Sequence, residues 1–206
     1  MGTDIKNTKQ NILDTALKLF SKRGYSAVSI RDIGNIVGIK ESTIYYHFKN
    51  KQDIFDELLK RFEKITNEKP IKFSKEFNKI TKVEKEAFIQ VGLGILKNYF
   101  LETEILQFIR MLMIEQHVNK AAADLYEQVI FEIPLKHNVS VFDALMKMNC
   151  FKNDDSNYMA LEYYSPILFI FQRYFSSGEV TEDKLEIAEH ELRIYLANFY
   201  DKYNIS

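Results

Sequence analysis

The chain has 206 residues, 46% of them hydrophobic, which is enough to bury a sizeable core in one large domain or in one small and one larger domain. Its single cysteine, Cys150, excludes an intramolecular disulfide, and the scarcity of glycine (7) and proline (3) favours an all-α fold. The longest apolar runs, such as Ile105–Ile114, are too short or too interrupted to span a bilayer. The N-terminus is polar and resembles no signal peptide, so we expect a cytoplasmic protein.

The charge is distributed unevenly, although the net charge is only −1. Residues 1–61 contain 11 Lys and Arg against 7 Asp and Glu, a net charge of +4, whereas the remaining residues contain 17 against 22, a net charge of −5. A basic module joined to an acidic one is typical of a protein whose basic part meets nucleic acid.

Two helices are predicted first. Apolar residues at helical spacing predict a helix over residues 8–23, which Gly24 ends. Ser29 is the expected N-cap of a second helix over residues 30–37, and Asp32 completes a capping box. The core face of this second helix is expected to hold Ile33 and Val37, with either Ile30 or Ile36 beside them.

A tight turn at Gly38 leads to a third predicted helix over residues 41–48, in which Ile44 and Phe48 share the buried face. Two short helices joined by a glycine turn and braced by a longer one predict a helix-turn-helix, whose second helix can enter the major groove. A fourth helix, capped by Asn50, carries a continuous apolar stripe: Ile54, Phe55, Leu58, Leu59, Phe62 and Ile65.

The rest of the chain also reads as helical. Residues 67–82 are lysine-rich and are interpreted as a connector. Helices are then expected at about 83–101, 103–117, 119–148 (broken near Pro134), 158–176 and 182–203, about nine in total. The helix over 158–176 is apolar on more than one side, so we expect its own domain to cover one face and a partner subunit another. We therefore predict a homodimer formed through residues 158–203.

Residues 8–61 resemble the TetR/AcrR family of bacterial transcriptional regulators. The matching pieces align without a gap: Ile12–Phe20, Gly24-Tyr25, Ser29–Ile33, Gly38-Ile39, Ser42–Phe48, Lys51 and Ile54–Leu58. The resemblance implies a helix-turn-helix DNA-binding domain at residues 1–50, a connecting helix at 51–66, and a helical ligand-binding and dimerisation domain at 67–206.

The resemblance also implies roles for individual residues. The positions that touch DNA phosphates and base edges in the family are taken by Thr43, Tyr45, Tyr46 and His47. Lys51 takes the position of a lysine that binds phosphate, and Ser29 takes that of a capping hydroxyl residue that meets the DNA backbone. Lys40, Glu41 and Ser42 fill the variable start of the recognition helix, and Arg31 and Lys40 are further candidates for phosphate contacts. Two residues depart from the family pattern: Lys40 replaces a small hydroxyl N-cap, and Gly34 stands where alanine is common.

Aromatic and methionine side chains are dense in the second part of the chain, which suits either a pliable apolar pocket or an ordinary core. The candidate ligand-binding residues are Phe108, Arg110, Met111, Glu115, Tyr126, Phe142 and Tyr163. Arg110 lies in an apolar run and requires a partner, either an internal acid such as Glu115 or Glu162, or an anionic ligand. No cysteine or histidine pattern predicts a metal site, and nothing predicts a cofactor.

These observations predict a homodimeric transcriptional regulator, most simply a repressor that an apolar or aromatic small molecule releases from a palindromic DNA operator. The alternative is a helix-turn-helix DNA-binding protein that acts through a protein partner without a small-molecule ligand. An enzyme with a DNA-binding head is disfavoured, because the sequence contains no glycine-rich phosphate loop, nucleophile elbow or paired cysteine motif.

Overall fold

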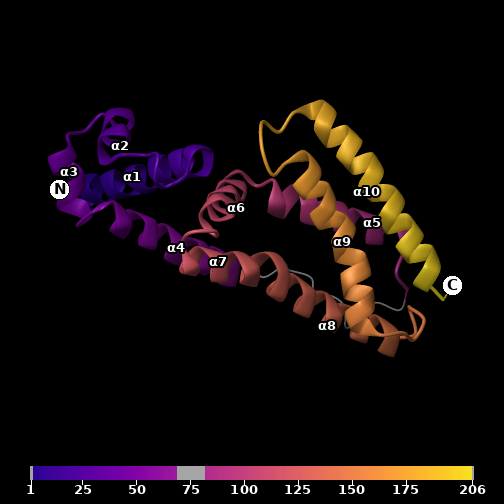
Figure 1. Cartoon of the computed structure of the whole chain (residues 1–206). Helices are drawn as coiled ribbons and strands as arrows, with labels where there is room; N and C mark the ends of the chain where they lie inside the picture. Colours follow the sequence, from indigo (N-terminus) through magenta and orange to yellow (C-terminus); the bar gives the residue numbers. More distant parts are fainter. Residues whose placement is uncertain (1, 69–81, 206) are drawn as a thin grey trace. The chain divides into compact units, whose positions relative to one another are not determined.

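The computed structural model describes residues 2–68 and 82–205, so most of the predicted connector at 67–82 lies outside the described residues. Among the described residues every regular element is a helix, and the only β-type pairing is an isolated bridge between Phe151 and Asn204. The chain divides into two compact units (Figure 1). The N-terminal unit comprises Met1–Lys69 and Thr103–Glu127, and the C-terminal unit comprises Pro70–Glu102 and Gln128–Ser206.

The N-terminal unit is built around its first helix. Its helices are α1 (Gly2–Arg23), α2 (Ile30–Val37), α3 (Glu41–His47), α4 (Lys51–Glu68), α6 (Thr103–Glu115) and α7 (Lys120–Glu127). Helix α1 packs against α2, α4 and α6 through the predicted apolar stripe, of which Ile12, Ala16 and Phe20 are completely buried. Because α6 packs on α1, residues 103–127 join the same compact unit as the helix-turn-helix.

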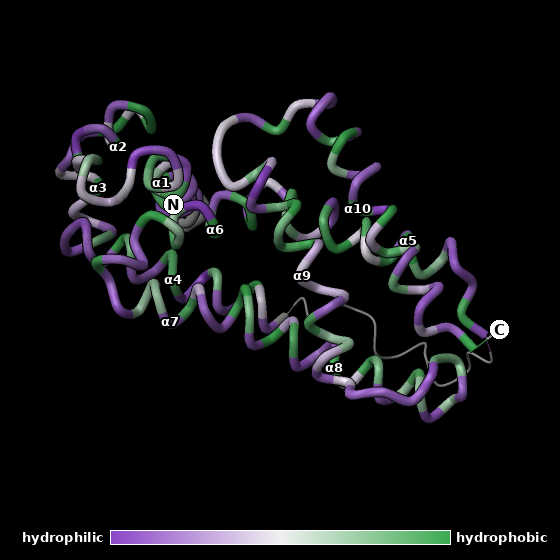
Figure 2. Tube along the Cα trace, turned by 45° about the vertical axis from the view of Figure 1, so that its right-hand side comes forward, coloured by the Kyte–Doolittle hydropathy of each residue, from purple (hydrophilic) through white to green (hydrophobic). Residues whose placement is uncertain are grey.

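The C-terminal unit contains α5 (Lys85–Gly94), α8 (Ile133–Lys147), α9 (Ser156–Tyr174) and α10 (Glu182–Tyr203). Figures 1 and 2 show α5 and α9 beside α10, and both pairs are in contact. A cluster of aromatic rings fills the space between these helices, with ring centroids 5.2–6.3 Å apart. Its members are Phe88, Phe142, Phe151, Tyr163, Phe199 and Tyr200.

The predicted all-α fold is confirmed, and helices occur in all nine predicted places within the described part of the chain. Two π-helical segments, η2 (Ile95–Phe100) and η3 (Gln128–Glu132), were not predicted. Segment η2 continues α5, and η3 joins α7 to α8. The predicted break near Pro134 is therefore a change of helix type. Pro134 lies in the first turn of α8, and the carbonyl of Ile130, four residues before it, accepts a hydrogen bond from the Tyr164 hydroxyl at 2.8 Å.

Candidate nucleic-acid interface

Helix α2 begins with the predicted capping box. Ser29 has an extended backbone, and its Oγ accepts a hydrogen bond from the Asp32 N–H at 3.1 Å. The Asp32 carboxylate in turn accepts hydrogen bonds from the Ser29 N–H and O–H, both at 2.8 Å. These bonds, the backbone one first, hold the pKa of Asp32 below its usual value. The start of α2 is thus fixed, and Ser29 remains exposed.

Two glycines shape the turn between α2 and α3. Gly38 adopts a left-handed conformation (φ +78°), and its N–H donates to the Gly34 carbonyl at 2.9 Å. A Cβ atom on Gly34 would lie 2.9 Å from the carbonyl oxygen of Ile39, closer than real Cβ atoms come. This close approach explains why glycine stands at position 34, since an alanine there would push the turn away from α2.

Helix α3 has one buried and one exposed face. Ile44 and Phe48 are 0% and 2% exposed, as predicted, and they seat the helix on the core. Tyr45 and Tyr46 are 51% and 73% exposed, so both side chains are accessible on the other face of the helix. Lys40 and Ser42 precede the two tyrosines at the start of the helix, and both are exposed. The Lys40 side chain makes no capping hydrogen bond.

Thr43 and His47 are half-buried, and the His47 ring meets the Tyr46 ring edge-on with centroids 5.2 Å apart. Arg31 is exposed in the first turn of α2. Nearly all predicted DNA-contacting side chains therefore lie on α2 and α3 or at their N-caps, where each is exposed or half-buried. The exception is Lys51.

Lys51 is tied into the loop between α1 and α2. Its Nζ donates to the carbonyl oxygens of Tyr25 at 2.8 Å and Val28 at 2.7 Å, and it lies 4.1 Å from the centroid of the Tyr25 ring. Burial lowers the pKa of this ammonium, and the charge of Glu115 opposes that change. Two of the three N–H donors are thus used inside the protein, a structural role that the sequence did not reveal.

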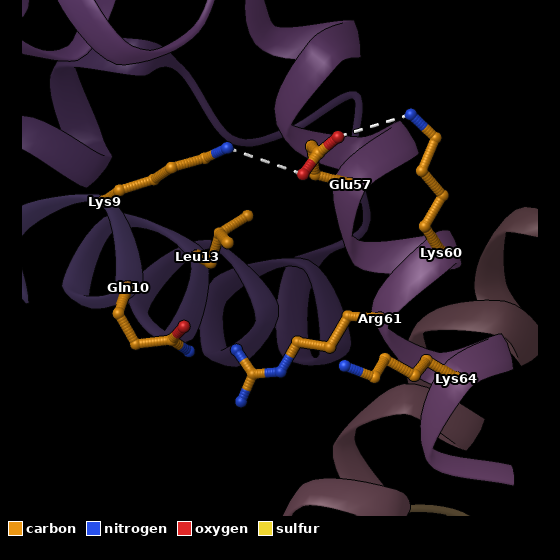
Figure 3. Close-up of a pocket in the computed structure, with 7 residues that line it drawn as sticks. All are labelled: Lys9, Gln10, Leu13, Glu57, Lys60, Arg61 and Lys64. Atoms are coloured by element: carbon orange, nitrogen blue, oxygen red, sulfur yellow. Dashed lines mark hydrogen bonds and ion pairs between the residues drawn. The ribbon is translucent and has the colours of Figure 1, made fainter. Parts of the chain in front are cut away.

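A groove between α1 and α4 adds a basic surface that sequence reasoning missed (Figure 3). It has a volume of about 370 Å³ and is lined by Lys9, Gln10, Leu13, Glu57, Lys60, Arg61 and Lys64. Glu57 bridges two of the lysines, Lys9 at 3.5 Å and Lys60 at 3.3 Å. Arg61 pairs with Asp14 of α1 and Glu104 of α6, both at 2.6 Å, so it ties three helices together. Only the excess of basic residues over acidic ones in residues 1–61 hinted at this surface.

The predicted ligand-binding residues fall into both compact units. The C-terminal unit contains Phe142 and Tyr163, and the N-terminal unit contains the other five: Phe108, Arg110, Met111, Glu115 and Tyr126. Phe108 is completely buried and stacks on Phe62 at 4.7 Å, whereas Phe142 and Tyr163 are part of the aromatic cluster. Burial raises the pKa of the Tyr126 and Tyr163 hydroxyls.

Arg110 is half-buried, and burial lowers the pKa of its guanidinium. The two acids expected as its partners have other hydrogen bonds. Glu115 accepts one from the Tyr25 backbone N–H at 2.7 Å, and Glu162 accepts from Lys202 at 2.8 Å and from the Tyr203 hydroxyl at 2.6 Å. Within the described residues no three His, Cys, Asp or Glu side chains are grouped to hold a metal ion, and no helix there is long and apolar enough to cross a membrane.

Residues 12–58 match the profile of the family described as bacterial regulatory proteins, tetR family. The HTH-type transcriptional regulator AcrR of Shigella flexneri is 36% identical over 74 residues, which are 36% of this chain and 34% of AcrR. IcaR of Staphylococcus aureus (strain Newman), a negative transcriptional regulator of the icaADBC biofilm operon, is 40% identical over 52 residues, 25% of this chain and 28% of IcaR. The matched stretch therefore spans about a third of these relatives.

Solved structures resemble the chain over nearly its whole length. A TetR-family regulator from Mesorhizobium loti has a TM-score of 0.73 at 18% identity, covering 98% of both chains. A transcriptional regulator from Saccharomonospora viridis in complex with choline has a TM-score of 0.67 at 20% identity, covering 92% of this chain and 95% of that one. At such identities the likeness shows the fold alone. Residues 12–58 therefore carry a helix-turn-helix similar to that of the TetR family, and the whole chain has the fold of these solved regulators.

Proposed function

We propose that this chain is a DNA-binding repressor that dissociates from a palindromic operator when a small molecule binds. The observation that carries the proposal is the split face of α3, with Ile44 and Phe48 buried and Tyr45 and Tyr46 exposed. Aromatic side chains projecting from a short helix that the core holds firmly suit insertion into a major groove, which admits an α-helix. Repression, rather than activation, is supported by the description of IcaR as a negative regulator.

The proposed DNA surface comprises the start of α2, the whole of α3 and the start of α4. Its residues are Ser29, Arg31, Lys40, Ser42, Thr43, Tyr45, Tyr46, His47 and Lys51. The N-terminus of α2 offers backbone N–H groups of its first turn to phosphate, whereas the Ser29 hydroxyl already donates to Asp32. Lys51 retains one N–H beyond its two carbonyl partners, so a phosphate contact adds to its structural role without replacing it.

Dimerisation through residues 158–203 is proposed from the outer faces of α9 and α10. Three large apolar side chains on α9 are about half exposed: Tyr158, Leu161 and Phe169. Three on α10 are exposed to a similar degree: Ile187, Ile194 and Tyr195. Their spacing places each set on one side of its helix. Two copies of this face would form a four-helix interface. The dimer would then contain two recognition helices, which must lie about 34–36 Å apart to reach successive half-sites.

The effector is proposed to be an apolar or aromatic small molecule bound in the ligand-binding domain at residues 67–206. The choline complex of the Saccharomonospora viridis regulator supports small-molecule binding by this fold. Candidate contacts are Phe108, Arg110, Met111, Glu115, Tyr126, Phe142 and Tyr163. Such a ligand lowers operator affinity only if it prefers a conformation in which the two half-sites are no longer matched.

Selection of duplexes from a randomised DNA pool tests the proposal. The full chain should enrich a palindrome, bind it as a dimer in an electrophoretic shift assay, and release it in the presence of an effector found by screening for thermal stabilisation. Failure to enrich any sequence would contradict DNA recognition. Tight binding of a small molecule that leaves operator affinity unchanged would contradict induction while leaving DNA recognition intact.

A further inference from the structure

The end of α6 holds the loop between α1 and α2 through one buried carboxylate. Glu115 is 5% exposed, and its Oε1 accepts a 2.7 Å hydrogen bond from the backbone N–H of Tyr25, which lies 90 residues earlier in the chain. A buried carboxylate is costly unless it is hydrogen-bonded, and charge-assisted bonds of this kind are the stronger ones. The bond therefore fixes Tyr25 relative to α6.

Gly24 allows this close approach. It ends α1 in a left-handed conformation (φ +77°). A Cβ atom at this position would lie 3.1 Å from Ile114 Cγ2 and 3.3 Å from Glu115 Oε1, which is tighter than most real Cβ contacts. The last turn of α6 thus rests directly on the backbone at the end of α1, and this contact places the carboxylate within reach of the Tyr25 amide.

The same loop is bound by Lys51 as well. Lys51 donates to the carbonyl oxygens of Tyr25 and Val28, and the attraction of the Glu115 charge favours its protonated form. The Tyr25 ring packs edge-on against Phe55 of α4, with centroids 5.2 Å apart. Tyr25 is therefore held through its N–H by α6, and through its carbonyl and ring by α4.

The held loop leads directly into the proposed DNA surface. Val28, whose carbonyl binds Lys51, precedes Ser29, the N-cap of α2. We propose that Glu115 is a positioning residue for DNA recognition: through the Tyr25 amide it sets the place of Lys51 and of the α2 N-terminus relative to α3. This inference rests on the proposed function, because it assumes that these groups meet DNA. It gives the buried Glu115 carboxylate a partner in the protein's own backbone.

The test compares three variants of the full chain. Glu115→Ala removes the acceptor, Glu115→Gln keeps an acceptor oxygen without the charge, and Glu104→Ala is the matched control. Glu104 also lies on α6 and also ties that helix to another helix of the N-terminal unit, through Arg61 of α4 at 2.6 Å. Each variant is titrated against the duplex that the wild-type chain enriches from a random pool. Its melting temperature and the hydrogen-exchange rate of the Tyr25 amide are also measured.

We expect Glu115→Ala to lower affinity about tenfold or more, which is the scale of losing one DNA contact, and to speed exchange at Tyr25. Glu115→Gln should recover most of the affinity, and Glu104→Ala should bind within about threefold of wild type at a similar melting temperature. The proposal is overturned if Glu115→Ala binds like wild type, or if Glu104→Ala loses as much affinity. Absence of DNA binding by the wild-type chain would instead refute the proposed function itself.

Discussion

Gly92 of α5 faces Leu196 of α10 at a distance that admits no side chain. A Cβ atom on Gly92 would lie 2.5 Å from Leu196 Cδ1 and 3.2 Å from its Cγ. Leu196 is 1% exposed, so it has little room to retreat. The glycine is therefore where α5 and α10 come into direct contact in the C-terminal unit.

Replacing Gly92 with alanine should destabilise the chain, because overpacking of roughly 1–3 kcal/mol outweighs the gain of about 1 kcal/mol in helix propensity. Gly94→Ala is the control on the same helix, since its Cβ would meet only Asn98 Nδ2 at 3.5 Å, an ordinary contact. Urea unfolding should rank the proteins as Gly94→Ala at or above wild type and Gly92→Ala below it. Equal midpoints for the two variants would show that Leu196 moves aside freely.

Tyr46→Ala should weaken binding to the selected duplex by roughly 1–3 kcal/mol, if the side chain reads base edges. Because Tyr46 is 73% exposed, the substitution should leave the unfolding midpoint nearly unchanged. Fluorescence anisotropy with a labelled duplex measures the loss, and Tyr46→Phe separates the contribution of the ring from that of the hydroxyl. Undiminished affinity in Tyr46→Ala would contradict the proposed docking of α3.

Lys51→Ala should cost both stability and DNA affinity. Two carbonyl oxygens lose a charged donor, at a cost of roughly 1–3 kcal/mol in the free energy of unfolding. If Lys51 also meets a phosphate, affinity should fall for all DNA sequences, and the slope of log K against log salt concentration should become shallower by about 1. An unchanged salt slope together with lost stability would restrict Lys51 to its structural role.

The matched control for Lys51 is Lys60→Ala on the same helix. The Lys60 side chain is 71% exposed, and its ion pair with Glu57 at 3.3 Å lies on the surface. We expect a stability change of at most about 0.5 kcal/mol for this variant. A comparable loss of stability in both variants would mean that the loop carbonyls gain little from Lys51.

Phe169→Glu should separate the proposed dimer, because it places a charge on the exposed apolar face of α9, where Phe169 is 55% exposed. Analytical ultracentrifugation should find a monomer that retains its helical circular dichroism. Val180→Glu is the control, since Val180 is an exposed apolar residue (42%) in the segment between α9 and α10 and not on the outer faces of those helices. Dissociation by both variants, or by neither, would argue against the α9–α10 interface.

Asp32 should make the protein sensitive to acid. Its pKa is lowered in the folded state, so its carboxylate stabilises the fold above the ordinary aspartate pKa of about 4, and this contribution is lost as the pH falls through the folded-state value. Urea midpoints measured between neutral and strongly acidic pH should therefore fall less steeply for Asp32→Asn than for wild type. Parallel curves would indicate that the capping box forms equally well with a neutral side chain.

Local sequence signals predicted the helix-turn-helix closely. The Ser29–Asp32 capping box, the turn at Gly38 and the 30–37 helix depend on residues within a few positions of one another, and all three are present. The choice between Ile30 and Ile36 could not be made from spacing, because both lie near the boundary of the apolar face. Contacts with the rest of the unit leave Ile30 8% exposed and Ile36 62% exposed.

Long-range contacts were beyond the reach of sequence patterns. The bond between Glu115 and Tyr25 joins residues 90 positions apart, and nothing near either residue indicates it. The grouping of residues 103–127 with the helix-turn-helix also depends on long-range contacts. The two π-helical segments were missed for another reason: at 6 and 5 residues they are too short for their i→i+5 bonding to show in the spacing of apolar residues.

The helical class, the order of the elements and the face that α3 exposes follow from local patterns, because periodicity, caps and glycine turns act over one or two helical turns. The side chains that hold that face in place are known only from the packing of the folded unit. Lys51 binds the loop carbonyls, Glu115 binds the loop amide and Gly34 admits the Ile39 carbonyl, since each of these depends on where distant or turning segments meet. The recognition helix can be predicted from residues 38–48 alone, whereas its position depends on contacts throughout the N-terminal unit.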